Sequence, residues 1–306
     1  MNLRNRTSRT GELKQYIQDK FTELDAKQPQ VNPPLELFHY SAPEGLIGIV
    51  QTTKLWATNI RYLNDFSEVK YTYDLLREMV SLISSKKSRP LKTFLEQFQK
   101  ELSFHEMIFD AYVFCLSETG DQLSQWREYA NRGIGYSVGF KGAGLKRLFG
   151  HRIGMKLLKV IYERHEQMKL IERIIIDSCN VFEDIERRYK DRTEKNILDC
   201  CDLLMAALTP YTVQFKHHVF YEEREWRIVF IPFHDINEHI VFRYSGKLIV
   251  PYIIFGLPEK EKLPINSVYQ GPQADFDLTR KSLQILFSQN NYSDISIRES
   301  EVPIRF

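Results

Sequence analysis

Residues Phe215 to Phe230 read FKHHVFYEEREWRIVF, and no other stretch of the sequence says as much about both fold and site. It begins with a basic cluster, passes through an acidic segment and ends in a hydrophobic run. Its second half alternates with the period of two that predicts a β-strand, with one face formed by Tyr221, Glu223, Glu225 and Arg227. Two carboxylates side by side on a strand raise the pKa of at least one of them unless cations lie near. This stretch is therefore the first candidate for a functional site.

The composition predicts an ordinary globular protein. The chain has 306 residues, of which 43% are hydrophobic and 27% charged, enough for one large domain or two modest ones. A formal net charge of +2 does not support a nucleic-acid-binding surface, and no apolar run approaches the roughly 20 residues of a membrane span. The four cysteines lack metal-ligand spacing, and Cys200 and Cys201 fall in an apolar helical pattern. We therefore expect buried free thiols, no membrane partner and a cytoplasmic location.

Hydrophobic periodicity predicts an α+β fold. A helical extension (1–33) containing an amphipathic helix ends at a proline-rich break, and one α+β domain (34–306) follows. The predicted strands cover 36–40, 54–58, 111–116, 133–140, 239–244, 248–255 and 295–298. The predicted helices cover 43–51, 68–84, 91–102, a short segment around Trp126, and 278–287. A strongly helical stretch (about 164–209) fits a helical-pair insertion, so we expect a mixed, mainly antiparallel sheet with surrounding helices.

Five segments together resemble a bacterial family known as domain of unknown function 2971. They are LFHYSA (37–42), LNDFSE (63–68), FCLSE with QWREYANRGIGYSVGF (114–140), Lys216 with EEREWR (222–227), and Phe255-Gly256 with the C-terminal helix and strand. LNDFSE resembles the family's Asn-Asp-Pro-x-Glu element, with Phe66 where proline is common. The resemblance runs from about residue 35 to the C-terminus and supplies no known activity. Our impression of the company this family keeps suggests a role in defence against phage.

The β-α-β-like start also looks like the opening of ADP-ribosyltransferases of the His-Tyr-Glu type. That resemblance implies that His39 binds a ribose hydroxyl, Tyr62 stacks on nicotinamide, and Glu225 stabilises the oxocarbenium-like transition state. Glu223 would be the outer glutamate of a Glu-x-Glu pair. Breaking the glycosidic bond of NAD creates positive charge at the ribose carbon, which a fixed carboxylate stabilises. NAD would then be a substrate, and no resident cofactor is indicated.

A metal-dependent nuclease is a second hypothesis. Asp65, Glu68, Glu223 and Glu225 would gather around Mg²⁺ or Mn²⁺, and Lys216 would hold a phosphate. The spacing of these residues does not require them to converge, and Asn64 and Asp65 equally suit the cap of the helix that starts near Glu68. The sequence therefore identifies no metal site.

A third hypothesis is a non-catalytic binding or interaction module. Arginines beside Glu223 and Glu225 would form a partly buried ion network, and Trp126 would be a core residue. Such a network would need no substrate. The candidate site combines the first-strand end with the acidic stretch, and under the enzyme hypothesis a small nucleotide is the expected partner. Its binding residues would be Tyr40, Tyr62, Asn64, Asp65, Glu68, Trp126, Lys216 and Arg227. The sequence does not indicate an oligomeric state.

Overall fold

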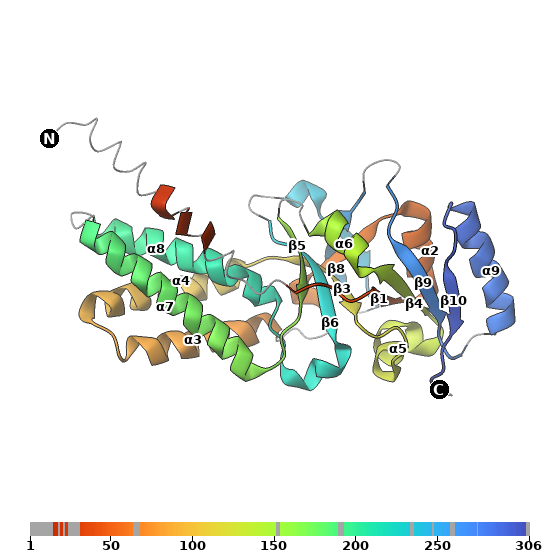
Figure 1. The fold of residues 1–306 in the computed structure, drawn as a ribbon, viewed down its shortest axis with the longest axis horizontal. Coiled ribbons are helices and arrows are strands. Elements are labelled where there is room, and N and C mark those ends of the chain that lie inside the picture. The colour runs from red at the N-terminus through yellow and green to blue at the C-terminus, as the bar shows by residue number, and fades with distance from the viewer. Residues whose placement is uncertain are drawn as a thin grey trace. The chain divides into compact units, whose positions relative to one another are not determined.

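The computed structural model describes residues 15–17, 19–20, 22–23, 31–63, 68–150, 154–188, 193–232, 236–246, 248–257, 261–273 and 275–303. The chain forms two compact units (Figure 1). The first is helical and takes in Ser67–Phe109 and Ile161–His218, together with the N-terminal stretch. The second contains the β-sheet and consists of Val31–Phe66, Asp110–Val160 and Val219–Phe306. In the described part of the chain, no helix is long and apolar enough to cross a membrane.

Four long amphipathic helices make up most of the described part of the helical unit. They are α3 (Glu68–Ser84), α4 (Arg89–Ile108), α7 (Arg164–Arg188) and α8 (Thr193–Leu208). Each turns a stripe of large apolar side chains inward, and the Phe94 and Phe182 rings stack with their centroids 4.9 Å apart. Cys179, Cys200 and Cys201 are free thiols buried in this core, as the apolar pattern predicted for the last two. The N-terminal residues packed here include Tyr16, whose hydroxyl donates to Asp184 at 2.6 Å.

Ten strands in the described part of the second unit form one sheet with the order β10-β9-β4-β1-β3-β2-β8-β7, and β6 joins β3 to β5. The strands are β1 (Glu36–Ser41), β2 (Leu55–Asn59), β3 (Tyr112–Ser117), β4 (Tyr136–Lys141), β5 (Met155–Lys159), β6 (Glu225–Phe230), β7 (Val241–Tyr244), β8 (Ile249–Phe255), β9 (Ile265–Gln270) and β10 (Ser296–Glu299). Only β9 and β10 pair in parallel among them. The mixed, mainly antiparallel sheet of an α+β fold is therefore confirmed.

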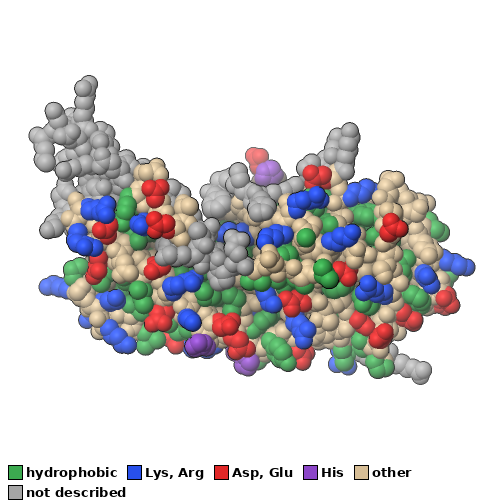
Figure 2. Space-filling model, viewed as in Figure 1, with side chains coloured by type: hydrophobic (Ala, Val, Ile, Leu, Met, Phe, Trp, Pro, Cys, Tyr) green, Lys and Arg blue, Asp and Glu red, His purple; other side chains and the backbone are tan. Residues whose placement is uncertain are grey.

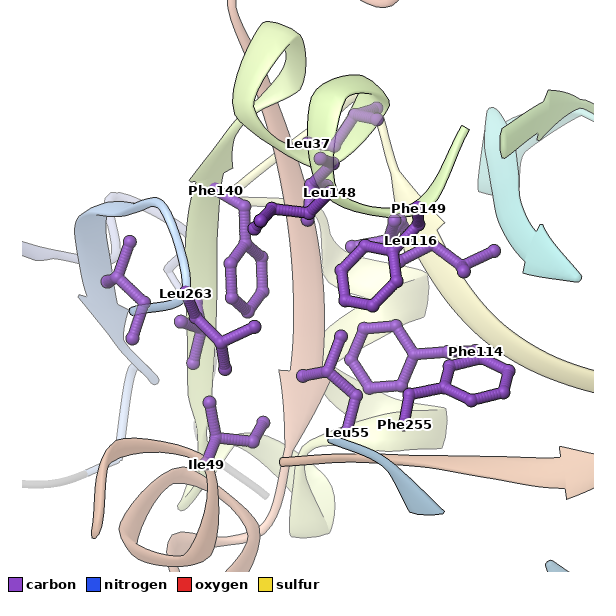
Figure 3. Packing of buried hydrophobic residues seen from close by; sticks show 14 of the residues in the cluster. Leu37, Ile49, Leu55, Phe114, Leu116, Phe140, Leu148, Phe149, Phe255 and Leu263 are labelled. Carbon is purple, nitrogen blue, oxygen red and sulfur yellow. The ribbon is translucent and has the colours of Figure 1, made fainter. Parts of the chain in front are cut away.

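One face of this sheet carries the main hydrophobic core, which is covered by α2 (Pro43–Thr52), α6 (Gly142–Phe149) and α9 (Phe276–Gln289). Figure 3 shows the side chains that meet there, among them Leu37 from β1, Phe114 from β3 and Phe140 from β4. The opposite face carries a smaller cluster, in which Trp126 of α5 (Leu123–Tyr129) packs on Phe38 and Tyr40. Alternation along β1 thus separates two environments, with His39 on the face of the main core and Tyr40 on the face of the smaller cluster.

Most predicted elements are present, and the differences lie where local pattern is weak. The helix predicted over 68–84 has those bounds, and the helical pair lies at Arg164–Arg188 and Thr193–Leu208. The sequence did not predict α6, β5 or β9. In the helical unit, α3 and α4 group with the helical pair that the sequence suggested as an insertion. The pair is therefore half of a four-helix arrangement.

Candidate functional site

The stretch 215–230 is not one continuous strand. A 3-10 helix (His218–Glu223) precedes β6, and Arg224 between them has a left-handed backbone with φ of 43°. The alternation predicted that Glu223 shares a strand face with Glu225. This prediction is wrong, because Glu223 ends the 3-10 helix and lies outside the strand. Its carboxylate accepts from the Tyr129 hydroxyl at 3.1 Å, and its backbone carbonyl accepts from Ser117 Oγ at 2.8 Å.

Glu225 and Arg227 form a buried, two-point ion pair on β6. Arg227 Nε lies 2.8 Å from Glu225 Oε1, and Arg227 Nη2 lies 2.8 Å from Oε2. Arg227 is 0% exposed and Glu225 4%. A paired guanidinium neutralises the carboxylate that the sequence analysis had assigned to oxocarbenium stabilisation. The geometry is the one that the ion-network hypothesis expected.

His39 is partly buried on the face of the sheet that carries the main core, and not beside Glu225. Its Nδ1 donates to the carbonyl oxygen of Cys115 at 2.8 Å, at the edge of β3 that β1 and β2 share, and its ring stacks on Phe114 with centroids 4.1 Å apart. A carbonyl only accepts, so Nδ1 carries the proton of the neutral imidazole. Burial, and next the charge of Arg243, lower the pKa of His39 to about 4.

Strand register places His39 and Glu225 on opposite faces of the sheet. Phe38 is the partner of Ser117, and Ser117 is the partner of Glu225. Directly paired residues point to the same face, and His39, which follows Phe38 on β1, points to the other. The ADP-ribosyltransferase resemblance implied that His39 and Glu225 lie at one site. The strand register places them on opposite faces of the sheet instead.

Tyr40 and Trp126 are structural residues of the smaller cluster. Their rings meet edge to face with centroids 4.9 Å apart. Trp126 is 0% exposed, which agrees with the hypothesis that it is a core residue. Trp126 Nε1 donates to Asp121 Oδ1 at 2.6 Å. The Tyr40 hydroxyl donates to the carbonyl of Thr119 at 2.9 Å and accepts from the backbone N–H of Gln122 at 3.0 Å. Both side chains thus hold the segment that follows β3.

The remaining predicted residues lie apart from this cluster or outside the described residues. Asn64 and Asp65 are not among the described residues. Tyr62 ends a short 3-10 helix and is 42% exposed. Glu68 and Lys216 belong to the helical unit, where they are 1% and 5% exposed. Lys216 was expected to hold a phosphate, but its side chain is buried.

The structure contains a pocket that the sequence did not predict. Its volume is about 460 Å³, and it is open to solvent. One wall comes from the segment after β3 and the other from the residues just before β6, because β3 and β6 are paired and their ends lie side by side. The lining includes Gln122, Ser124, Arg127, Tyr221, Glu222 and Arg224. The sequence could have predicted this pocket only if the pairing of β3 with β6 were known, because its basic and aromatic residues lie far apart in the chain.

Several contacts join the two walls of this pocket. Gln122 Nε2 donates to the carbonyl of Glu222 at 2.8 Å, and the N–H of Glu118 donates to the carbonyl of Arg224 at 3.1 Å. In the described part of the chain, no three His, Cys, Asp or Glu side chains are grouped as a metal ion requires. On the face drawn in Figure 2, basic and acidic side chains are interspersed. The arrangement is that of an open pocket whose lining contains two arginines and one glutamate.

Comparison with known proteins agrees with the family resemblance. The model of the family described as protein of unknown function (DUF2971) matches residues 125–228, which confirms the resemblance over this region. The match contains Arg127, Tyr221, Glu222 and Arg224 of the pocket as well as β6. No curated protein and no solved structure matches the chain.

Proposed function

We propose that this protein is a non-catalytic binding module that takes a small anionic ligand in the pocket beside β6. The observation that carries the proposal is the placement of Arg127 and Arg224 on the two walls of one open pocket. Guanidinium groups recognise carboxylate and phosphate through several N–H donors in a fixed plane, and they stay charged at all physiological pH values. A pocket of about 460 Å³ falls in the range of small-molecule sites.

The buried ion pair favours binding over NAD cleavage. Both Glu225 oxygens accept from Arg227, and His39 faces the main core on the other side of the sheet. NAD cleavage by the His-Tyr-Glu arrangement needs His39 and Glu225 at one substrate. NAD cleavage and a role in phage defence therefore remain predictions. The ion pair instead acts in our proposal as the rigid support of the pocket wall that precedes β6.

Isothermal titration calorimetry with inorganic pyrophosphate tests this function. We expect binding by the native chain that weakens as salt is raised, because exposed charges are screened. Arg224→Glu should weaken it at least about tenfold, because the substitution replaces an attraction by a repulsion. The matched control is Arg280→Glu, an exposed arginine on α9 outside the pocket, which should leave the affinity unchanged.

Two results would contradict the proposal. The first is absence of pyrophosphate binding, or equal weakening by Arg224→Glu and Arg280→Glu. The second is release of nicotinamide from NAD by the native chain that is lost in both His39→Ala and Glu225→Gln. That second pattern would establish the enzyme hypothesis in its place.

A further inference from the structure

We infer that the ligand of this pocket is a phosphorylated nucleoside, an inference that rests on the proposed function. The pocket combines three kinds of side chain. Arg127 and Arg224 supply positive charge, Glu222 supplies a carboxylate and Tyr221 an aromatic ring. An anionic group, a hydroxyl-bearing sugar and a planar base are the ligand parts that match these three chemistries.

Arg224 is the residue of the pocket that is best placed to hold an anion. Arg224 is exposed, and its side chain makes no hydrogen bond or ion pair with another of the described residues, although its charge helps to lower the pKa of the Glu118 carboxyl. The left-handed backbone of Arg224, with φ of 43°, is uncommon for a residue with a Cβ and is held by the bond from the Glu118 N–H to its carbonyl. Strained backbone of this kind persists where the surroundings fix it, and it gathers at ligand sites.

Glu222 discriminates between a bare anion and a nucleotide. A carboxylate lining the pocket repels an inorganic anion, which lowers its affinity. A ligand that carries hydroxyl groups next to its anionic group meets the same carboxylate as a hydrogen-bond acceptor. Carboxylates hold the ribose hydroxyl of bound dinucleotides in this way. The mixed charge of the pocket therefore favours a ligand with a sugar.

Tyr221 and Ser124 complete the set of ligand contacts. Tyr221 is 59% exposed, so its ring is available to stack on a planar base. Ser124 lines the pocket, and its Oγ is buried and has no hydrogen-bond partner among the described residues. A hydroxyl left without a partner is costly, and a ligand oxygen would supply the missing contact.

The wall that follows β3 is held in place before any ligand arrives. Asp121 accepts from Trp126 Nε1, from Ser300 Oγ at 2.5 Å and from the backbone N–H of Glu301 at 2.8 Å. The Tyr40 hydroxyl fixes Thr119 and Gln122 on either side of it. Because these contacts exist in the free protein, little ordering is left for the ligand to impose.

Titrations with adenosine diphosphate, its 2′,3′-dideoxy analogue and inorganic pyrophosphate test the inference. We expect the ribonucleotide to bind at least about tenfold more tightly than pyrophosphate, since base stacking alone gives about that factor. Glu222→Gln should weaken the ribonucleotide and strengthen pyrophosphate, because it removes both an acceptor and a repulsion. Tyr221→Ala should weaken both nucleotides by similar factors and leave pyrophosphate unchanged. Tyr244→Ala, at another exposed tyrosine, is the matched control.

The outcomes separate this inference from the function on which it rests. Opposite responses of ribonucleotide and pyrophosphate to Glu222→Gln would support the nucleoside ligand. Equal affinity for all three ligands, with pyrophosphate still lost in Arg224→Glu, would overturn the inference and leave the anion pocket standing. Failure of all three to bind would overturn both. Circular dichroism of each variant establishes that it is folded before titration.

Discussion

Two buried polar clusters of this protein satisfy their hydrogen bonds in different ways. In the helical unit, Gln167 is 0% exposed and uses a neutral amide. Its Nε2 donates to the carbonyls of Ile161 and Lys216 at 2.6 and 3.0 Å, and its Oε1 accepts from the Tyr71 hydroxyl at 2.7 Å. In the sheet unit, the Glu225–Arg227 cluster uses full charges.

The two clusters should differ in how much the free energy of unfolding falls when one partner is removed. A neutral amide leaves behind unpaired dipoles, which cost about 1–3 kcal/mol each when buried. A charged pair adds little net stability, because desolvation offsets its attraction, but the loss of one partner leaves a buried charge. We therefore expect the pair on β6 to be more sensitive than the helical cluster to the loss of one partner.

The largest effect is expected from Arg227→Met. The substitution preserves much of the side-chain volume but leaves Glu225 without its guanidinium at a buried position. We expect the free energy of unfolding to fall by about 3–5 kcal/mol. Urea denaturation followed by circular dichroism measures the change.

The double variant Glu225→Leu/Arg227→Met is the control for this substitution. Replacing both partners by apolar groups removes the stranded charge, so most of the lost stability should return. A single variant that loses less than about 1 kcal/mol would show that solvent reaches this pair. The contrast with the neutral cluster would then fail.

A second, somewhat smaller effect is expected from pH, through His39. The pKa of His39 is about 4 in the folded chain against an ordinary value of 6.5, so between these pH values the unfolded chain binds more protons. Stability conferred by the neutral imidazole is therefore present above pH 6.5 and is lost as pH falls toward 4. The loss should approach about 3 kcal/mol. Unfolding free energies measured from pH 7.5 to 4.5 give the slope.

His39→Gln should flatten this slope, because it removes the titrating group while keeping a side chain that donates hydrogen bonds. The same change at His239, an exposed position, should leave the slope as it is. An unchanged slope in His39→Gln would mean that other groups produce the acid sensitivity. Arg243 is the cation that lowers the pKa of His39, so Arg243→Gln should reduce the slope in part.

Local pattern predicted the long helices and the core role of Trp126, because an apolar stripe every three to four residues reports burial directly. It failed at β5, whose five residues are all half-buried and therefore show no alternation. It failed again at Glu223, where the sequence continues to alternate but the backbone of Arg224 turns left-handed. Such a reversal is set by the contacts of the surrounding loops and not by the residue type.

The candidate site was less predictable than the fold because it depends on strand register. Whether His39 and Glu225 share a face follows from the pairing of Phe38 with Ser117, which no local pattern contains. The same holds for Arg127 and Arg224, which line one pocket because β3 pairs with β6. The 3-10 helical half of the acidic stretch lines the proposed pocket with Tyr221 and Glu222, whereas its strand half carries the buried Glu225–Arg227 pair.

The smallest of these effects is expected from Gln167→Leu, which breaks the neutral cluster. The carbonyl of Ile161 keeps its bond from the N–H of Lys216 at 3.2 Å, and the Tyr71 side chain is only partly buried. The orphaned groups are therefore few, and we expect a loss of about 1–3 kcal/mol, below that of Arg227→Met. The matched control is Gln99→Leu, which removes one exposed bond to Ser81 within the same unit and should change stability by less than about 0.5 kcal/mol. Gln167→Leu could instead lower the free energy of unfolding as much as Arg227→Met does. In that case the sensitivity of the β6 pair would come from its burial, which both clusters share, and not from its formal charge.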